Sequence, residues 1–429
     1  MSQFVIQGGK PLRGTVAPIG NKNAALPLMA ASLLTSEPIH LSNVPDIADV
    51  RVMLAILEEM GVSVRWDGPS DLTLHAHDAV SSELPDELTR RIRASILFVG
   101  PLLARTGSVT MPPPGGDVIG RRRLDSHFHA LGKLGAEVEM GARFRLLAPS
   151  LEGTEIFLDE ASVTATENAL MAATLARGRT ILWNAACEPH VQDLAELLVS
   201  MGARIQGAGT NRIVVDGVSE LGGASHRIQP DHVEIGSFVG LAAVTGGEIT
   251  IQGVAARHLQ MILQTFGKMG LAAELRGTDL IVPEQQALSV RYDLGGAIPQ
   301  IEDGPWPAFP SDLMSIALVV ATQASGTVLF FEKMFESRMY FVDSLISLGA
   351  RIVLCDPHRA VVVGPSPLYG GRVVSPDIRA GMALLLAALA AQGETVIENI
   401  AQIDRGYERI DEKIRALGGR IERRPNPEG

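Results

Sequence analysis

The sequence has few cysteines and no excess of basic residues, and both absences narrow the classes of protein to which it can belong. Only Cys187 and Cys355 occur among 429 residues, so the chain offers neither a disulfide framework nor the spacing of a cysteine metal site. This scarcity suits a reducing compartment, and we expect the cytoplasm. A formal net charge of −11 argues against a general nucleic-acid-binding protein, because a phosphate backbone requires a basic surface.

Signals for export, membrane insertion and nucleotide-binding loops are also missing. The N-terminal segment 1–14 lacks the apolar run of a secretory signal. The longest uncharged stretch, 313–331, carries Gln, Ser, Gly and Thr in its second half, so we interpret it as a buried helix, a turn and a strand. Neither the Walker pattern nor the dinucleotide-binding glycine pattern occurs.

What the sequence does contain is an internal repeat. One phrase recurs, in which an amphipathic helix ends in a large apolar residue followed by glycine and a short β-like run, as in LEEMGVSVRW and LISLGARIVL. Only glycine enters the left-handed helix cap at little cost, so we expect these glycines to end equivalent helices. The repeated glycines, spaced by roughly 70 residues, are Gly61, Gly135, Gly202, Gly270, Gly349 and Gly418.

A second recurring phrase consists of a polar start, an alanine-rich helix, a glycine-containing turn and a β-branched strand. The two phrases together predict an α/β fold of about six repeated units. The alanine-rich helices are apolar all round, so we expect them to be buried, and their converging N-termini would favour a polyanion. Their polar residues cluster at the helix starts and are Lys22, Asn23, Arg93, Thr166, Glu167, Glu234, Asp312, Asp377 and Arg379.

The stretch PPPGGDVIGRRR at 112–123 stands apart from the repeats. It is too rich in proline and glycine to form the middle of a helix or a central strand, so we expect a loop. Asp117 is followed closely by three consecutive arginines within it. From the residues alone, the loop is either a solvated charge cluster or a lid that handles an anion.

Eight short motifs resemble those of the enolpyruvyl transferases. Most are weak singly, but in this order and spacing, over nearly the full length of the chain, they are specific. They are GNKNAALP (20–27), IRASILFVGPLLAR (92–105), PGGDVIGRR (114–122), PDHVEIGSF (230–238), AFPSDLMS (308–315), FESRMYF (335–341), DIRAG (377–381) and IDRGYERI (403–410).

The resemblance implies a two-lobed inside-out α/β barrel with three repeated units in each lobe and the active site between the lobes. One lobe is expected at 22–230, with a mobile loop at 112–123. The other is expected at 1–21 and 231–429, because the N-terminal strand of the family pairs back into the C-terminal lobe. The resemblance implies no cofactor, no metal, no nucleic acid and no membrane, and a monomer or weak homo-oligomer.

The activity implied by the resemblance is transfer of the enolpyruvyl group of phosphoenolpyruvate to the 3-hydroxyl of UDP-N-acetylglucosamine, with release of phosphate. This is the first committed step of peptidoglycan synthesis, and it serves cell-wall biogenesis, cell shape, cell division and the cell cycle. Such chemistry needs an acid for the methylene carbon, a base for the hydroxyl and cations for the carboxylate and phosphate.

The resemblance also assigns roles. Asp117 stands where most relatives carry cysteine and is the expected acid, Asp312 is the expected base, and Lys22 and Arg405 complete the catalytic set. A carboxylate at 117 implies that fosfomycin, which alkylates the usual thiol, does not inactivate the enzyme. The expected substrate-binding residues are Lys22, Asn23, Arg93, Arg122, Arg123, Leu124, Asp125, Ser126, His127, Ser162, Val163, Asp312, Met334, Phe335, Arg338, Asp377, Arg379 and Arg405.

The residues by themselves leave plainer interpretations open. Asp312 could be a helix N-cap, Asp117 could cap local loop N–H groups, and each cation could be a solvated surface charge. His127 and His129 do not share a helix face and have no third ligand nearby in sequence, so we do not expect them to hold a metal. His127 instead matches a family position next to the nucleotide.

Departures from the family pattern gather near the expected uridine site. They weaken the substrate assignment more than the reaction assignment. Three alternatives therefore remain. The acceptor is a different nucleotide, or it is shikimate 3-phosphate, or the protein is a non-catalytic binding paralogue. The departures are Leu97, Glu160, Thr164, His190 and the segment 123–127.

Overall fold

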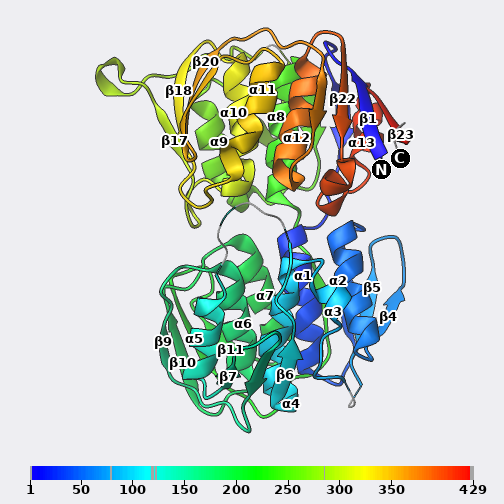
Figure 1. Cartoon of the computed structure of the whole chain (residues 1–429), viewed down its shortest axis with the longest axis vertical. Helices are drawn as coiled ribbons and strands as arrows, with labels where there is room; N and C mark the ends of the chain where they lie inside the picture. The colour runs from blue at the N-terminus through cyan, green and yellow to red at the C-terminus, as the bar shows by residue number, and fades with distance from the viewer. Residues whose placement is uncertain (1, 78–79, 117–119, 121–122, 285, 426–429) are drawn as a thin grey trace. The chain divides into compact units, whose positions relative to one another are not determined.

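The computed structural model describes residues 2–425 except 78–79, 117–119, 121–122 and 285. Its contacts divide the chain into two compact units (Figure 1). Unit 1 is formed mainly by residues 1–19 and 230–429, and unit 2 mainly by residues 20–117 and 122–229.

Unit 2 has three sheets in its described part, with strand orders β13-β3-β5-β4, β6-β8-β7 and β11-β12-β10-β9. Its strands are β3 (Ile39–Ser42), β4 (Ser63–Trp66), β5 (Leu72–His75), β6 (Ser108–Met111), β7 (Glu137–Glu139), β8 (Phe144–Leu147), β9 (Glu155–Phe157), β10 (Arg179–Trp183), β11 (Arg204–Gln206), β12 (Arg212–Asp216) and β13 (Ala224–Arg227). Its helices are α1 (Lys22–Ala31), η1 (Ser32–Leu34), α2 (Ala48–Glu59), α3 (Asp86–Thr89), η2 (Arg93–Phe98), α4 (Val99–Thr106), α5 (Asp125–Lys133), α6 (Val163–Thr174) and α7 (Pro189–Ser200).

Unit 1 likewise has three sheets among its described residues, with strand orders β21-β22-β1-β23, β15-β16-β14-β2 and β17-β18-β20-β19. Its strands are β1 (Ser2–Gln7), β2 (Arg13–Val16), β14 (Glu248–Ile251), β15 (Glu274–Arg276), β16 (Asp279–Val282), β17 (Gln300–Glu302), β18 (Gly326–Phe331), β19 (Ile352–Asp356), β20 (Arg359–Gly364), β21 (Arg372–Val374), β22 (Glu394–Glu398) and β23 (Arg420–Pro425). Its helices are α8 (His232–Thr245), η3 (Ala256–His258), α9 (Gln260–Gly267), η4 (Leu294–Gly296), η5 (Ser311–Leu313), α10 (Met314–Gln323), η6 (Arg338–Phe341), α11 (Val342–Ser347), α12 (Ile378–Ala390), η7 (Ile400–Arg405) and α13 (Ile410–Ala416).

The repeated glycines end helices as predicted. All six have a positive φ, between 82° and 107°, just after the C-terminal turn of a helix. At the first of them, the N–H of Gly61 bonds to the carbonyl of Glu58 and the N–H of Val62 bonds to that of Leu57. Because a side chain is strained at such φ values, each glycine fixes where its helix stops and the next strand begins.

The apolar helices of the repeats form the interior. In unit 1, α8, α10 and α12 pack against one another, and the sheets flank them (Figure 1). Burial of each large aliphatic side chain contributes about 1.5–3 kcal/mol, so the core fixes the positions of the helix starts. The segment 313–331 is the predicted buried helix, turn and strand. Among the described residues, no helix is both long enough and apolar enough to span a membrane.

The N-terminal strand belongs to unit 1. β1 pairs antiparallel with β22 on one side and with β23 on the other, and Phe4 lies opposite both Ile397 and Arg423. The chain then enters unit 2 near residue 20 and returns near residue 230. The N-terminal strand is therefore an integral part of the unit that contains the C-terminal half of the chain.

Candidate functional site

Asp312 lies between two arginines in unit 1. Its Oδ1 accepts a hydrogen bond from Nη2 of Arg338 and its Oδ2 accepts one from Nη2 of Arg379, both at 2.7 Å. The side chain of Asp312 is 23% exposed, whereas those of Arg338 and Arg379 are 11% and 7% exposed. Charge-assisted bonds of this kind are short and strong, so they fix the carboxylate and both guanidinium groups in one cluster.

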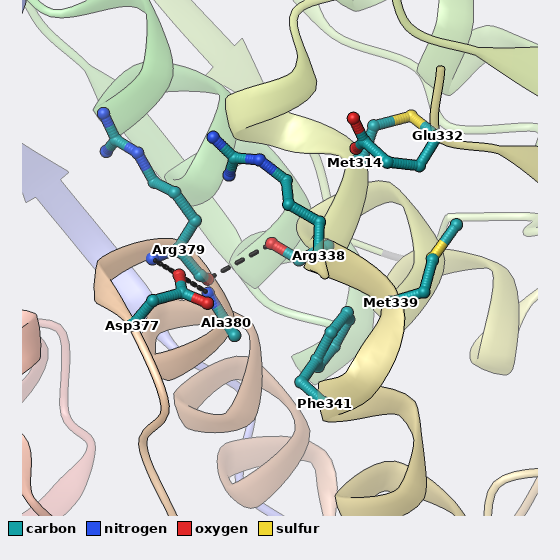
Figure 2. A pocket seen from close by; sticks show the side chains of 9 residues that line it. Met314, Glu332, Arg338, Met339, Phe341, Asp377, Arg379 and Ala380 are labelled. Carbon is teal, nitrogen blue, oxygen red and sulfur yellow. Dashed lines mark hydrogen bonds between the residues drawn. The ribbon is translucent and has the colours of Figure 1, made fainter. Parts of the chain in front are cut away.

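The start of α12 contributes Arg379 to this cluster. Asp377 is the N-cap of α12, and its carboxylate accepts the backbone N–H groups of Arg379 and Ala380. Figure 2 shows the side chains of Arg338 and Arg379 extending in the same direction, with Asp377 at the first turn of α12. The two arginines also line a small pocket together with Met314. The cap therefore fixes the backbone that orients Arg379.

Arg379 is further positioned by Tyr407, which the sequence reasoning missed. Nη1 of Arg379 lies 3.4 Å from the hydroxyl of Tyr407, and that hydroxyl lies 3.1 Å from Oγ of Ser237 on α8. Burial opposes the charge of Arg379, but the Asp312 carboxylate holds its pKa above the usual value. Arg379 therefore stays a cation inside the core.

The start of α8 reaches the same cluster through His232, a second residue that was missed. His232 is buried, and burial lowers its pKa, while the nearby Asp231 and Asp312 carboxylates oppose that shift. Its ring lies 5.6 Å from that of Trp306. The starts of α8, of the η5–α10 segment and of α12 therefore meet, which confirms within unit 1 the convergence predicted from the repeats.

In unit 2, Lys22 is a buried cation at the start of α1. Its Nζ lies 2.7 Å from Oδ2 of Asp49, and the two side chains are 8% and 6% exposed. Asn21 caps the helix by accepting the N–H of Ala24 at 3.0 Å. Asp49 was missed, although an aspartate on the apolar face of α2 was a usable signal.

Arg93, at the start of η2, contacts the segment that leads into α5. Its Nη2 donates to the carbonyl of Arg123 at 2.9 Å. Arg123 forms a two-bond pair with Asp125, at 2.7 and 2.9 Å. Ser126 donates to Asp159 at 2.6 Å. This segment of predicted substrate-binding residues is therefore held by contacts between its own side chains and its neighbours in unit 2.

His127 is fully buried and is linked to α6. Its Nδ1 accepts from Nδ2 of Asn168 at 2.9 Å, so Nε2 carries the hydrogen and donates to Oγ1 of Thr164 at 3.0 Å. Burial, assisted by the charge of Arg93, lowers the pKa of His127 to about 3. The imidazole is therefore neutral, and its nitrogens serve the packing of α5 on α6.

Comparison with known proteins gives the family. A family model described as EPSP synthase (3-phosphoshikimate 1-carboxyvinyltransferase) matches residues 6–414. The chain belongs to this family of 1-carboxyvinyltransferases. It is 56% identical to a UDP-N-acetylglucosamine 1-carboxyvinyltransferase of Treponema denticola, with 98% of this chain and 99% of the relative covered. It is 55% identical to a protein of the same name from Bradyrhizobium diazoefficiens, with coverage of 99% and 98%.

Solved structures show the fold of the 1-carboxyvinyltransferases. The enolpyruvyl transferase NikO from Streptomyces tendae matches with a TM-score of 0.89 at 25% identity, with 99% of each chain covered. EPSP synthase from Acinetobacter baumannii matches with a TM-score of 0.75 at 17% identity, with 99% of this chain and 100% of that chain covered. The predicted fold class, a two-lobed α/β barrel of the enolpyruvyl transferase type, is thereby confirmed.

The structure contradicts two plainer interpretations of the sequence. Lys22 and Arg379 are 7% and 6% exposed, so the alternative of solvated surface charges is wrong for both. The alternative of an N-cap is wrong for Asp312, because Pro310 occupies that position and both oxygens of Asp312 bond to arginines.

Other predicted residues of the family site lie at element ends. Ser162 caps α6 through the N–H of Ala165, and Val163 begins that helix. Phe335 stacks under the guanidinium of Arg338 at 5.1 Å. The rest are Asn23 in α1, Leu124 before α5, Met334 in an exposed position, and Arg405 at the end of η7. Asp117 and Arg122 lie outside the described residues.

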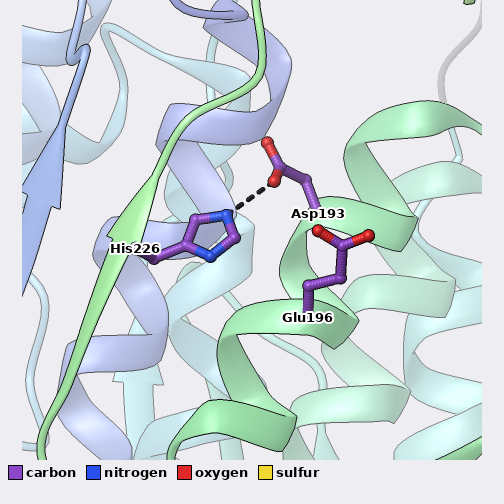
Figure 3. A group of neighbouring side chains, drawn as sticks. All are labelled: Asp193, Glu196 and His226. Atoms are coloured by element: carbon purple, nitrogen blue, oxygen red, sulfur yellow. Dashed lines mark hydrogen bonds and ion pairs between the residues drawn. The ribbon is translucent and has the colours of Figure 1, made fainter.

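A possible metal-binding group occurs elsewhere in unit 2. Asp193, Glu196 and His226 each place a ligand atom within 4.8 Å of the others (Figure 3). Oδ1 of Asp193 lies only 2.6 Å from Nε2 of His226, and Oδ2 accepts the N–H of Gln229 at 3.1 Å. An ion between two ligands at about 2.0–2.1 Å each needs a wider separation. We interpret the group as a structural contact between α7 and β13.

Proposed function

We propose that the protein transfers the enolpyruvyl group of phosphoenolpyruvate to the 3-hydroxyl of UDP-N-acetylglucosamine and releases phosphate, the first committed step of peptidoglycan synthesis. The observation that carries the proposal is the Asp312 carboxylate held at 2.7 Å from both Arg338 and Arg379. A base beside two buried cations suits a reaction that deprotonates a hydroxyl next to an anionic substrate. Relatives with this activity in their name, at more than half identity over nearly the full length, support the acceptor.

The chemistry has two stages. The sugar oxygen attacks C2 of phosphoenolpyruvate while C3 accepts a proton, which gives a tetrahedral intermediate that still carries phosphate. C3 then loses a proton as the bond from C2 to the phosphate oxygen breaks, so the double bond re-forms as an enol ether. In this proposal Asp312 accepts the hydroxyl proton and Asp117 supplies the proton to C3.

The cations bind the donor substrate. Lys22, Arg122, Arg379 and Arg405 are proposed to bind the carboxylate and phosphate of phosphoenolpyruvate. The planar guanidinium fork matches both groups, whereas Lys22 acts as a point charge. Tyr407 and Asp312 act on Arg379 from two sides, so its guanidinium is oriented before substrate binds.

Phosphate release from phosphoenolpyruvate tests the acceptor. We expect turnover with UDP-N-acetylglucosamine and none with UDP plus free N-acetylglucosamine. Preference for shikimate 3-phosphate, which the name of the family model suggests as the second candidate, would replace the proposed acceptor. Absence of phosphate release with every acceptor would favour a non-catalytic paralogue.

Two substitutions test the assigned roles. Asp312→Asn should lower kcat by at least about 100-fold, the scale of a lost general base. The matched control is Asp356→Asn, which alters a partly exposed aspartate paired with Arg359 in the same unit and should leave kcat unchanged. Asp117→Asn should abolish turnover while sugar-nucleotide binding persists, and the wild-type enzyme should resist fosfomycin. Normal turnover of Asp117→Asn, or rapid irreversible inactivation by fosfomycin, would contradict the role of Asp117.

A further inference from the structure

Glu332 is a carboxyl group inside the core of unit 1, directly after β18. Glu332 is 0% exposed, and it lines the same small pocket as Arg338 and Arg379 (Figure 2). A buried carboxyl group costs free energy unless it is neutral or well paired. Its contacts therefore require an explanation.

One carboxyl group holds two segments of the proposed active site. Oγ of Ser311 lies 2.9 and 3.0 Å from the two oxygens of Glu332. Oε1 of Glu332 also accepts the N–H groups of Met334 at 3.3 Å and Phe335 at 3.2 Å. Ser311 directly precedes Asp312, and Phe335 lies three residues before Arg338. Glu332 thus contacts the backbone segments that carry both members of the Asp312–Arg338 pair.

A second buried acid lies against Glu332. Asp303 is 2% exposed, and its Oδ1 accepts the N–H of Lys333 at 2.5 Å. Its Oδ2 is buried and has no hydrogen-bond partner in the part of the chain that the structure describes. Burial, and then the neighbouring Asp303, raise the pKa of Glu332 to about 9, although Arg338 and Ser311 oppose the shift.

We propose that Glu332 carries a proton and donates it to Oδ2 of Asp303, and that this shared proton makes Glu332 a positioning residue for Asp312 and Arg338. The inference rests on the function proposed above. The shared proton satisfies an otherwise orphaned buried acceptor and avoids two adjacent buried charges. It leaves the other bonds of Glu332 free to hold Ser311 and the 334–335 backbone.

Loss of this proton would disturb the cluster. An ionised Glu332 would compete with Asp312 for Arg338, whose Nε is buried and unpartnered among the described residues. Lys333 is already paired with Glu302 at 2.8 Å. His358 bonds to the backbone of Glu332, through its Nδ1 to the carbonyl and through its own carbonyl to the N–H. The charged or titratable groups around the carboxyl group are Asp303, Asp312, Lys333, Arg338, His358, Asp377 and Arg379.

The pH dependence of kcat tests the proposal, with kcat and KM measured from pH 6 to pH 10. Wild type should lose activity as pH rises through about 9. Glu332→Gln, which mimics the neutral acid, should keep kcat at pH 7 within about threefold and lack this alkaline loss. Glu332→Ala should lower kcat at least about tenfold at pH 7 with little change in KM. Glu302→Gln, an exposed acid on the neighbouring strand β17, is the matched control and should behave as wild type.

Asp303→Asn adds a test of the shared proton itself. Asparagine can donate to Glu332, so Glu332 should ionise more readily and the alkaline loss of activity should move at least one pH unit lower. The positioning role would be overturned if Glu332→Gln lost activity at alkaline pH as wild type does, or if Glu332→Ala had an unchanged kcat.

The shared proton between Glu332 and Asp303 can be tested even if the proposed acceptor is wrong. If wild type shows no turnover with UDP-N-acetylglucosamine, the proposed function is wrong. The proton shared by Glu332 and Asp303 is then tested by the infrared difference spectrum of wild type minus Glu332→Gln at pH 7. A protonated-carboxyl absorption in that difference supports the shared proton, and its absence refutes it.

Discussion

Replacing Asn168 by alanine should destabilise unit 2 far more than the loss of one hydrogen bond. Asn168 is 0% exposed in α6. Its Oδ1 accepts the N–H of Gly100 at 2.7 Å, and its Nδ2 donates to the carbonyl of Ile96 at 2.8 Å and to Nδ1 of His127 at 2.9 Å. One amide group therefore joins α6 to the η2–α4 junction and to α5.

The magnitude follows from the partners left behind. The alanine variant removes three bonds, and each buried partner left unsatisfied costs about 1–3 kcal/mol. The backbones of α4 and α6 are already in close contact, because a Cβ added at Gly100 would lie only 2.4 Å from the carbonyl oxygen of Asn168. The two helices therefore cannot easily move together to fill the space left by the Asn168 side chain. Because the structure around a shortened side chain usually relaxes in part, we expect a loss of about 3–6 kcal/mol in the free energy of unfolding.

The matched control lies on the same helix. Thr174 is equally buried, but among the residues that the structure describes its hydroxyl bonds only to the carbonyl of Met171 in its own helix, at 2.7 Å. Thr174→Ala should therefore cost about 1 kcal/mol. Together the two variants separate a contact between helices from a contact within one helix.

Urea unfolding followed by tryptophan fluorescence measures both variants. Trp66 and Trp183 belong to unit 2, so a Trp306→Phe background makes the signal specific for that unit. The variants are compared by their midpoints at equal slope. A cost for Asn168→Ala within about 1 kcal/mol of that for Thr174→Ala would refute the reasoning.

Two further predictions concern unit 1. Because folded Glu332 keeps a proton up to about pH 9 and the unfolded residue releases it near its ordinary value, the free energy of unfolding should fall as pH rises between them. From pH 6 to pH 8 the fall should be about 2–3 kcal/mol larger in wild type than in Glu332→Gln, measured by urea unfolding, and equal slopes would contradict it. Gly381→Ala places a Cβ 2.2 Å from Oγ of Ser375 and should lower stability by about 1–3 kcal/mol. Gly267→Ala, with no atom within 4 Å, should be neutral or stabilising by up to about 1 kcal/mol in thermal melts, and a similar loss in both variants would argue against the steric cause.

The local parts of the fold were predictable because their causes are local. Gly61 and its five counterparts end helices because the left-handed cap is cheap only for glycine, which depends on neighbouring residues alone. The buried helix at 314–323 followed from its uninterrupted apolar composition in the same way. Repetition of both signals predicted the α/β class and the number of repeated units.

The pairing of charges was not predictable, because it depends on contacts between distant segments. Asp49 pairs with Lys22 from another helix, and Tyr407 contacts Arg379 across 28 positions of sequence. Glu332 follows an apolar strand and has the sequence pattern of an ordinary surface acid at a strand end. Only the folded chain shows that it is buried beside Asp303.

The helix starts attract anions differently in the two units. In unit 1 the caps of α8 and α12 are the carboxylates of Asp231 and Asp377, and each adds a full negative charge where the helix supplies about half a positive one. In unit 2 the caps of α1 and α6 are the neutral side chains of Asn21 and Ser162. Converging helix dipoles therefore cannot by themselves make unit 1 attractive to a polyanion. Its attraction must come from guanidinium groups such as Arg379, which the anionic caps hold in place.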